Sequence, residues 1–200
     1  MIYLASQSPR RRQLLDQIGV AHQLLLPGED EDAEALEAER PGEPPEAYVR
    51  RVTLAKLQAA LQRLERRALP AAPVLAADTT VALEARILGK PRDASDARDM
   101  LAALSGRAHR VLTAVALGGV PGRDAALALS VSTVRFAPLP AQAIERYVDG
   151  GEPFGKAGGY AIQGAIAAWV ERVEGSHSGI VGLPLFETAG LLRQAGLLPP

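Results

Sequence analysis

The sequence contains no cysteine. Structural disulfides and thiolate catalysis are therefore excluded, and the composition suits a reducing cytosol. The sequence also lacks an apolar run near the roughly 20 residues that a membrane-spanning helix needs, and it does not open on a charged segment followed by a long apolar one. These absences predict a soluble, cytoplasmic protein with no membrane partner.

Aromatic residues make up only 4% of the chain, and the formal net charge is −1. So few aromatic rings argue against the stacking platforms that bind single-stranded nucleic acid. A nearly neutral chain also has no global basic field that attracts a nucleic acid. We therefore expect no nucleic-acid partner, and an anionic ligand has to be bound by charges gathered locally.

Histidine is rare as well. The three histidines form no His-Glu-x-x-His pattern. His109 has no serine or carboxylate at a spacing that indicates a nucleophilic triad. A zinc hydrolase and a triad hydrolase are therefore disfavoured.

The hydrophobic pattern predicts strands mixed with helices. No linker or low-complexity stretch divides the 200 residues, so we expect a single domain, residues 1–200. The strands at 109–117 and 127–136 are expected to form an antiparallel pair. The full set of expected strands is 2–5, 21–26, 72–83, 109–117, 127–136 and 166–173; the expected helices are 9–19, 46–67, 94–104, 140–148 and 185–195; residues 175–179 are expected to form a turn.

The first dozen residues contain a junction suited to an anion. The apolar run 2–5 stops at a Ser-Gln-Ser sequence, and Ser8 as N-cap with Pro9 at the first helical position predicts the start of a helix. Arg10–Arg12 then lie in the first turn, where the helix dipole disfavours a cation by roughly 0.3–1 kcal/mol. Free N–H groups, hydroxyls and guanidinium groups suit a phosphate chain, but a turn with solvated arginines also explains the pattern.

A carboxylate interrupts the apolar strand pattern of residues 74–83. Asp78 stands there, followed by Thr79 and Thr80. Aspartate is depleted in strands and costly to bury without a partner. A metal ion or a catalytic role explains such a residue, and the alternative is an aspartate that caps a turn.

Three other charged features carry weaker signals. Lys56 falls among the apolar positions of the helix expected at 46–67. A lysine at such a position more often packs its aliphatic chain against apolar neighbours and extends its ammonium group into water than binds a ligand. Lys90 stands before a proline, which restricts its backbone to a stiff turn. The acidic run 29–32 reads as a solvated loop, although its carboxylates are also able to hold a divalent cation.

Residues 151–164 contain five glycines around Lys156 and Gln163, which indicates a loop whose backbone approaches another group closely. The segment matches neither a Walker A loop nor a G-x-G-x-x-G turn. The side chain of Gln163 offers the donor and acceptor that read N3–H and O4 of uracil or thymine, and because an amide flips, cytosine stays open. Ser176 and Ser178 either bind phosphate or stabilise a turn, and the second reading is favoured.

Several spaced motifs occur in one order: Leu4–Arg11, Ala77–Val81, Gly89–Pro91, Leu104–Gly106, Lys156–Gly164 and Val181–Leu185. Together they resemble the Maf family of nucleoside triphosphate pyrophosphatases over nearly the whole chain. The Gly-Gly-Tyr-Ala-Ile-Gln-Gly segment and the threonine after Asp78 resemble the subgroup that acts on dTTP and UTP more than the subgroup that acts on 7-methyl-GTP.

The resemblance implies a fold and a reaction. The fold is α/β, an elongated mixed β-sheet flanked by helices in two lobes with a central cleft, similar to the inosine triphosphate pyrophosphatase-like folds. The reaction is hydrolysis between the α and β phosphates with a divalent cation, Mg²⁺ or Mn²⁺, which yields the monophosphate and pyrophosphate and removes non-standard or excess nucleotides. Homodimers are common in the family.

The resemblance also assigns roles to residues. Asp78 matches the catalytic acid-base position, and Glu31 together with Asp78 matches the acidic positions that hold the metal. The expected substrate-binding and specificity residues are Ser6, Ser8, Arg10, Arg11, Lys56, Thr79, Lys90, Lys156 and Gln163.

One departure from the family pattern is Gly155, which stands where the family has aspartate. If that carboxylate is essential, activity is weak or another acid such as Glu152 replaces it. Two alternative functions stay open: a pyrophosphatase for 7-methyl-GTP or another modified or purine nucleotide, and a nucleotide-binding regulator of cell division with weak catalysis.

Overall fold

The computed structural model describes residues 1–29 and 31–199, in which seven strands form one mixed sheet. The order is β2-β1-β3-β5-β6-β7, and β4 pairs with the last residues of β3. β1 runs parallel to β2 and β3, whereas the other pairings are antiparallel. The bounds are β1 Ile2–Leu4, β2 His22–Leu24, β3 Val74–Leu83, β4 Arg86–Leu88, β5 Ala108–Gly118, β6 Ala126–Phe136 and β7 Val170–Glu174.

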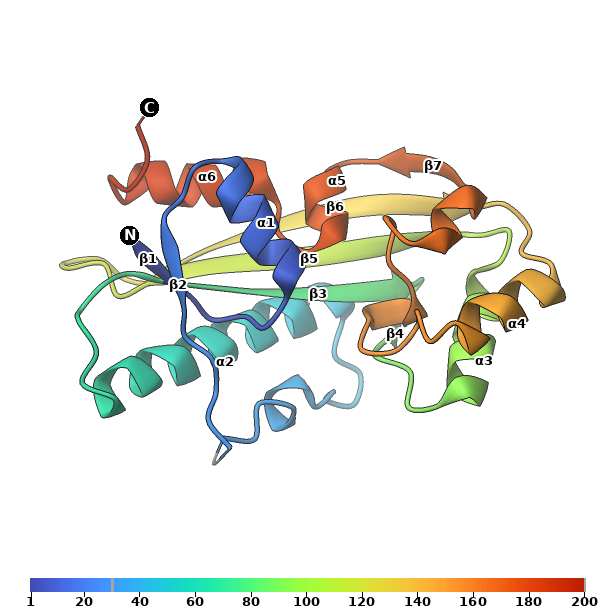
Figure 1. The fold of residues 1–200 in the computed structure, drawn as a ribbon, viewed down its shortest axis with the longest axis horizontal. Helices are drawn as coiled ribbons and strands as arrows, with labels where there is room; N and C mark the ends of the chain where they lie inside the picture. Colours follow the sequence, from blue (N-terminus) through green and yellow to red (C-terminus); the bar gives the residue numbers. More distant parts are fainter. Residues whose placement is uncertain (30, 200) are drawn as a thin grey trace.

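Helices cover both faces of this elongated sheet (Figure 1). The long helix α2 lies along one face, α1, α5 and α6 lie on the other, and α3 and α4 gather at one end of the long strands (Figure 1). The bounds are α1 Pro9–Gln17, α2 Pro45–Arg66, α3 Ala94–Leu104, α4 Ala141–Asp149, α5 His177–Val181 and α6 Leu185–Gln194, with 3₁₀ turns η1 Ala35–Glu37, η2 Ala157–Gly159 and η3 Ala165–Trp169. No helix in the described ranges is both long and apolar enough to cross a membrane.

The double coverage explains the sequence of the central strands. β3 and β5 are buried along nearly their whole length, which accounts for their almost continuous apolar runs. On α2, the buried residues Leu57, Ala60 and Leu64 recur every three or four positions and pack against residues of β3 and β5. A polar side chain on this part of β3 therefore has to find its partners inside the protein.

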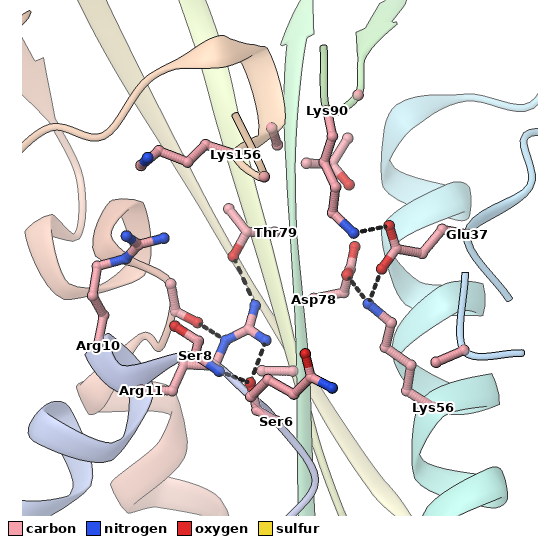
Figure 2. A pocket seen from close by; sticks show the side chains of 18 of the residues that line it. Ser6, Ser8, Arg10, Arg11, Glu37, Lys56, Asp78, Thr79, Lys90 and Lys156 are labelled. Atoms are coloured by element: carbon pink, nitrogen blue, oxygen red, sulfur yellow. Dashed lines mark hydrogen bonds and ion pairs between the residues drawn. The ribbon is translucent and has the colours of Figure 1, made fainter. Parts of the chain in front are cut away.

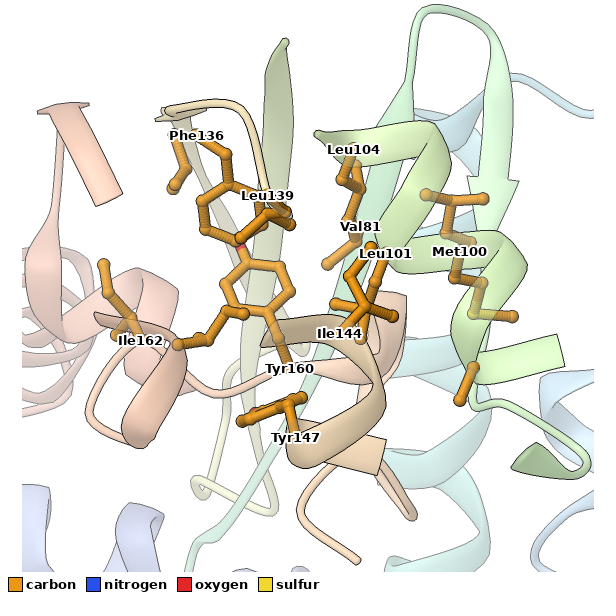
Figure 3. Close-up of a cluster of buried hydrophobic side chains, with 14 of the residues drawn as sticks. Val81, Met100, Leu101, Leu104, Phe136, Leu139, Ile144, Tyr147, Tyr160 and Ile162 are labelled. Atoms are coloured by element: carbon orange, nitrogen blue, oxygen red, sulfur yellow. The ribbon is translucent and has the colours of Figure 1, made fainter. Parts of the chain in front are cut away.

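A separate hydrophobic cluster supports the far end of the sheet. Side chains of α3 and α4 pack there against the ends of β3 and β6 and against Tyr160 and Ile162 of the glycine-rich segment (Figure 3). We call this group the α3–α4 cluster. It forms the core of one lobe, while the clusters around α1, α2 and α6 form the other.

The structure confirms the predicted fold class, a mixed sheet flanked by helices, and the antiparallel pairing of β5 with β6. Two local predictions are wrong. The predicted strand 166–173 begins as the turn η3, because its alanine-rich start has little strand propensity and Ile166 packs into the α3–α4 cluster. The predicted turn 175–179 contains the start of α5, which a side-chain cap initiates. Asp30, part of the predicted acidic loop, lies outside the described residues.

Candidate active site

A cavity of about 740 Å³ opens beside the middle of β3. This volume lies within the range of roughly 300–1,000 Å³ that is typical of small-molecule sites. Its wall is formed by the N-terminus of α1, residues 27–28 and 31–37, α2, the β4 turn and the glycine-rich segment. The wall contains every site residue predicted from the sequence: Ser6, Ser8, Arg10, Arg11, Glu31, Lys56, Asp78, Thr79, Lys90, Lys156 and Gln163.

Charged side chains of alternating sign line one side of the cavity (Figure 2). The Lys56 ammonium lies 2.6 Å from Oδ1 of Asp78 and 2.8 Å from Oε1 of Glu37. The Lys90 ammonium lies 2.7 Å from Oε2 of Glu37. The turn-capping alternative for Asp78 is wrong, because this residue pairs with Ala114 within the sheet. The expectation that the Lys56 ammonium extends into water is also wrong, because it forms ion pairs with the carboxylates of Asp78 and Glu37.

Sequence reasoning missed Glu37. The residue lies in η1, a single turn with no periodic pattern, and it follows the predicted acidic run by several residues. The Tyr48 hydroxyl on α2 donates to the Glu37 carbonyl at 2.8 Å and so fixes this turn beside Lys56. Burial raises the pKa of Glu37, but the charges and hydrogen bonds of Lys56 and Lys90 outweigh burial and hold the pKa below its ordinary value.

Arg10 and Arg11, at the start of α1, are used differently. The Arg11 guanidinium donates to the Gly182 carbonyl at 2.7 Å, to Ser6 Oγ at 3.1 Å and to Thr79 Oγ1 at 3.3 Å. Within the described residues the Arg10 side chain forms no hydrogen bond or ion pair, and Figure 2 shows it pointing toward the cavity, on the same side as Lys156. Arg10 is therefore available to a ligand, whereas Arg11 is committed to the protein.

The glycine-rich segment brings a lysine and an amide to the opposite wall. The Lys156 ammonium contacts the carbonyls of Glu152 and Phe154. Burial, and then the nearby Arg10 charge, lower the pKa of Lys156. Two cations on the same side of a cavity form a site suited to an anion.

Gln163 lies on the same segment, with its side chain exposed to the cavity. Glu152, the predicted substitute for the absent aspartate, accepts the Ala165 N–H at 3.3 Å. Ser176 and Ser178 are structural, as favoured: the Ser176 hydroxyl caps α5, and the Ser178 hydroxyl accepts the Leu185 N–H.

Glu31 lines the cavity among arginines. Its carboxylate binds Arg63 at 2.6 Å and Arg66 at 3.0 Å. Hydrogen bonds from Arg63 lower the pKa of Glu31 to about 2 against the opposing effect of burial. Across the described ranges, no group of three or more His, Cys, Asp or Glu side chains gathers to hold a metal ion. The role of Glu31 as a metal ligand stays a prediction.

The family model and the curated relatives that match this chain point to the same family. The family model described as Maf-like protein matches residues 1–195. A protein named dTTP/UTP pyrophosphatase from Burkholderia pseudomallei is 66% identical over 194 residues, which cover 97% of this chain and 93% of that protein. A protein of the same name from Cupriavidus pinatubonensis is 62% identical over 196 residues, covering 98% and 97%.

Among solved structures, a nucleoside-triphosphatase / dITP/XTP pyrophosphatase from Mycobacterium abscessus is 17% identical. The match covers 70% of this chain and 75% of that chain, with a TM-score of 0.45.

Proposed function

The chain belongs to the Maf family, and from this premise we propose that it hydrolyses dTTP and UTP to the nucleoside monophosphate and pyrophosphate. One observation carries the proposal. The cavity holds a carboxylate paired with a lysine on one wall, and on the other Arg10 and Lys156, which form no ion pair among the described residues. A triphosphate carries about four negative charges, and its cleavage depends mainly on positioned cations and a positioned water.

The residues on the two walls of the cavity have different roles in this reaction. Arg10 and Lys156 bind the phosphate chain from one side, and Lys90 binds it from the other. The Asp78 carboxylate accepts a proton from the water that attacks the α-phosphorus. The bond between the α-phosphorus and the α–β bridging oxygen then breaks, and pyrophosphate leaves with its added charge stabilised by the lysines. Lys56 holds the Asp78 carboxylate in place for this step.

A divalent cation, Mg²⁺ or Mn²⁺, fits the donor set. Mg²⁺ typically takes one or two protein carboxylates and completes its shell with water and phosphate oxygens, so the site needs no cluster of three acids. Asp78 and Glu37 converge on one ammonium, which marks a point where two carboxylates meet a cation. We propose Asp78 and Glu37 as ligands, and keep Glu31, which lines the same cavity and binds Arg63 and Arg66, as the further acid proposed from the family resemblance. When bound there, the cation would supply positive charge that offsets the charge of the phosphate oxygens.

Gln163 supplies the base recognition in this proposal, because its amide matches N3–H and O4 of uracil and thymine. Removal of non-standard or excess nucleotides is the role proposed from the family resemblance, together with a homodimeric state in the cytoplasm. Light scattering coupled to size exclusion tests the dimer.

Pyrophosphate release from dTTP, UTP, CTP, 7-methyl-GTP, ITP and ATP, with Mg²⁺ or Mn²⁺, tests the function. We expect dTTP and UTP to be the best substrates, and Asp78→Asn to lower their turnover by roughly 10²–10⁴-fold. The control is Asp99→Asn, which removes an exposed carboxylate of α3 outside the cavity wall and is expected to keep wild-type activity.

Near-normal turnover by Asp78→Asn at saturating Mg²⁺ contradicts the role given to Asp78. Preference for 7-methyl-GTP or a purine nucleotide moves the activity to the alternative pyrophosphatases. Tight nucleotide binding without pyrophosphate release from any substrate supports the regulator instead.

A further inference from the structure

A buried polar pair lies beneath the glycine-rich segment. Nε2 of His109, on β5, lies 2.6 Å from the hydroxyl of Tyr160. The two residues are 2% and 6% exposed; Tyr160 belongs to the α3–α4 cluster, and His109 lies against it. The Phe136 ring packs against both, with centroid distances of 5.1 Å and 5.0 Å. Because both residues are almost fully buried, the Tyr160 hydroxyl and the His109 Nε2 depend on each other for a hydrogen bond.

Tyr160 belongs to the part of the chain that forms the cavity wall. Residues 156–163, which we call the recognition arm, carry Lys156 and Gln163 into the cavity. Figure 3 shows the Tyr160 ring within the α3–α4 cluster, with Tyr147 and Ile162 at its edges. The arm therefore joins a cavity-lining surface to a buried support.

Three long-range hydrogen bonds fix the recognition arm within the described residues. The Gly158 N–H donates to the Gly89 carbonyl at 2.9 Å, next to Lys90. The Ala161 N–H donates to the Tyr147 hydroxyl at 3.4 Å. The Tyr160–His109 bond lies between these two in sequence and is the shortest of the three. It is also the one that ties the arm to the central sheet through a side chain.

We propose that His109 is a positioning residue for nucleobase selection, which it exerts through Tyr160 on the recognition arm. This inference rests on the proposed function, in which Gln163 reads the base. The bond sets the height of the arm above β3 and so the place of the Gln163 amide relative to the phosphate-binding side of the cavity.

Two single variants and their combination test the proposal. Tyr160→Phe removes one oxygen and keeps the ring packed against Phe136, and His109→Leu removes the partner. We expect each to raise the KM for UTP about 5–10-fold, as loss of one hydrogen bond implies, while kcat changes less than about twofold because Asp78 and its lysine are untouched. The preference for UTP over CTP falls by a similar factor, and the double variant adds little to either single change.

The control is Met100→Ala, which removes volume from the same cluster. Met100 lies on α3, apart from Tyr160 in Figure 3. The Met100→Ala substitution is expected to lower the melting temperature without changing the preference for UTP over CTP. If Tyr160→Phe behaves like this control, with a lower melting temperature and an unchanged ratio, the pair is only structural and the proposal is overturned.

Hydrogen–deuterium exchange on the whole chain gives a readout that does not depend on activity. In Tyr160→Phe, the amides of residues 158–164 are expected to exchange faster while those of β3 keep their wild-type rates. Unchanged exchange in the arm overturns the proposal. If the wild-type protein hydrolyses no pyrimidine nucleotide, the proposed function and the selection role both fail, and exchange still decides whether His109 holds the arm.

Discussion

At the scale of single residues, Arg10 and Arg11 are neighbours of the same type with opposite uses. The Arg11 guanidinium donates hydrogen bonds to a carbonyl and two hydroxyls of the protein, whereas the Arg10 side chain faces the cavity. We expect Arg10→Ala to raise the KM for UTP by about 10–100-fold, since hydrogen bonds to charged groups contribute about 1.5–3 kcal/mol. Its unfolding free energy should change by less than about 0.5 kcal/mol.

Arg11→Ala is the matched comparison. It leaves the Gly182 carbonyl without its donor in a partly buried place, so we expect a loss of about 2–3 kcal/mol in unfolding free energy. Urea denaturation and steady-state kinetics of both variants separate the roles. An Arg10 variant with wild-type KM contradicts the phosphate-binding assignment, and an Arg11 variant of wild-type stability contradicts the structural one.

His109 gives the stability of the protein a pH dependence. Burial lowers the pKa of His109 to about 4, against about 6.5 in the unfolded chain. Because the unfolded state then binds the proton more readily, the contribution of His109 is fully present above pH 6.5 and is lost as the pH falls toward 4. Between pH 7 and pH 5 we expect the unfolding free energy to fall by about 2 kcal/mol from this residue.

Urea denaturation at the two pH values measures this change. His109→Leu should lose most of the difference between pH 7 and pH 5, whereas the exposed His177→Gln should retain it. Equal pH dependence in the wild type and in His109→Leu contradicts the assignment to His109.

Some of these site residues could be predicted from the sequence, and others could not. Asp78 is evident, because a carboxylate inside an apolar strand pattern needs a buried partner, and Lys56 supplies it. Glu37 is hidden, because its place depends on a hydrogen bond from Tyr48, eleven residues away, and on no local pattern. The Arg10–Arg11 difference is likewise set by Gly182, at the other end of the chain.

At the scale of elements, the glycine-rich segment depends on one glycine for close packing. Gly158 has φ +68, and a Cβ there would lie 2.8 Å from a methyl carbon of Val81 on β3. Gly155 has a similar φ of +73, but a Cβ there meets open space. Both positions have a left-handed backbone that would strain any added side chain, and they differ in what a Cβ would contact.

We therefore expect Gly155→Ala to cost about 1 kcal/mol from backbone strain alone. Gly158→Ala should cost about 1–3 kcal/mol more from overpacking, and should lower UTP turnover by displacing the recognition arm. The double variant with Val81→Ala should recover part of the turnover. Chemical denaturation and pyrophosphate release measure both effects, and equal costs at the two glycines contradict the packing argument.

Helices and strands with a long, regular spacing of apolar residues could be predicted from the sequence, and short elements could not. α2 and β3 have long runs of apolar residues at one spacing, so their positions follow from the sequence. α5 has five residues and η3 has five, too few for a period to develop. Their conformations come from a cap at Ser176 and from the burial of Ile166, which only the assembled fold supplies.

At the scale of the whole molecule, the cavity lies where the two lobes meet. Arg10, Lys56 and Asp78 belong to elements that pack with α1 and α2, while the recognition arm rests on the α3–α4 cluster. A ligand that contacts both walls therefore links the two hydrophobic clusters. Such a ligand stabilises the folded state by an amount set by its concentration relative to its Kd.

This linkage predicts a thermal shift. At about 100 times its Kd, an α,β-methylene analogue of UTP, which resists cleavage, should add about 2.7 kcal/mol with Mg²⁺ present. For a chain of this length, that corresponds to a rise of about 5–10 °C in melting temperature. Removal of Mg²⁺ with EDTA, or the Arg10→Ala substitution, should remove most of the rise, because each leaves phosphate charge uncompensated. An equal rise with and without Mg²⁺ contradicts the proposed metal ligands, since the nucleotide would then be held by the lysines and Arg10 alone.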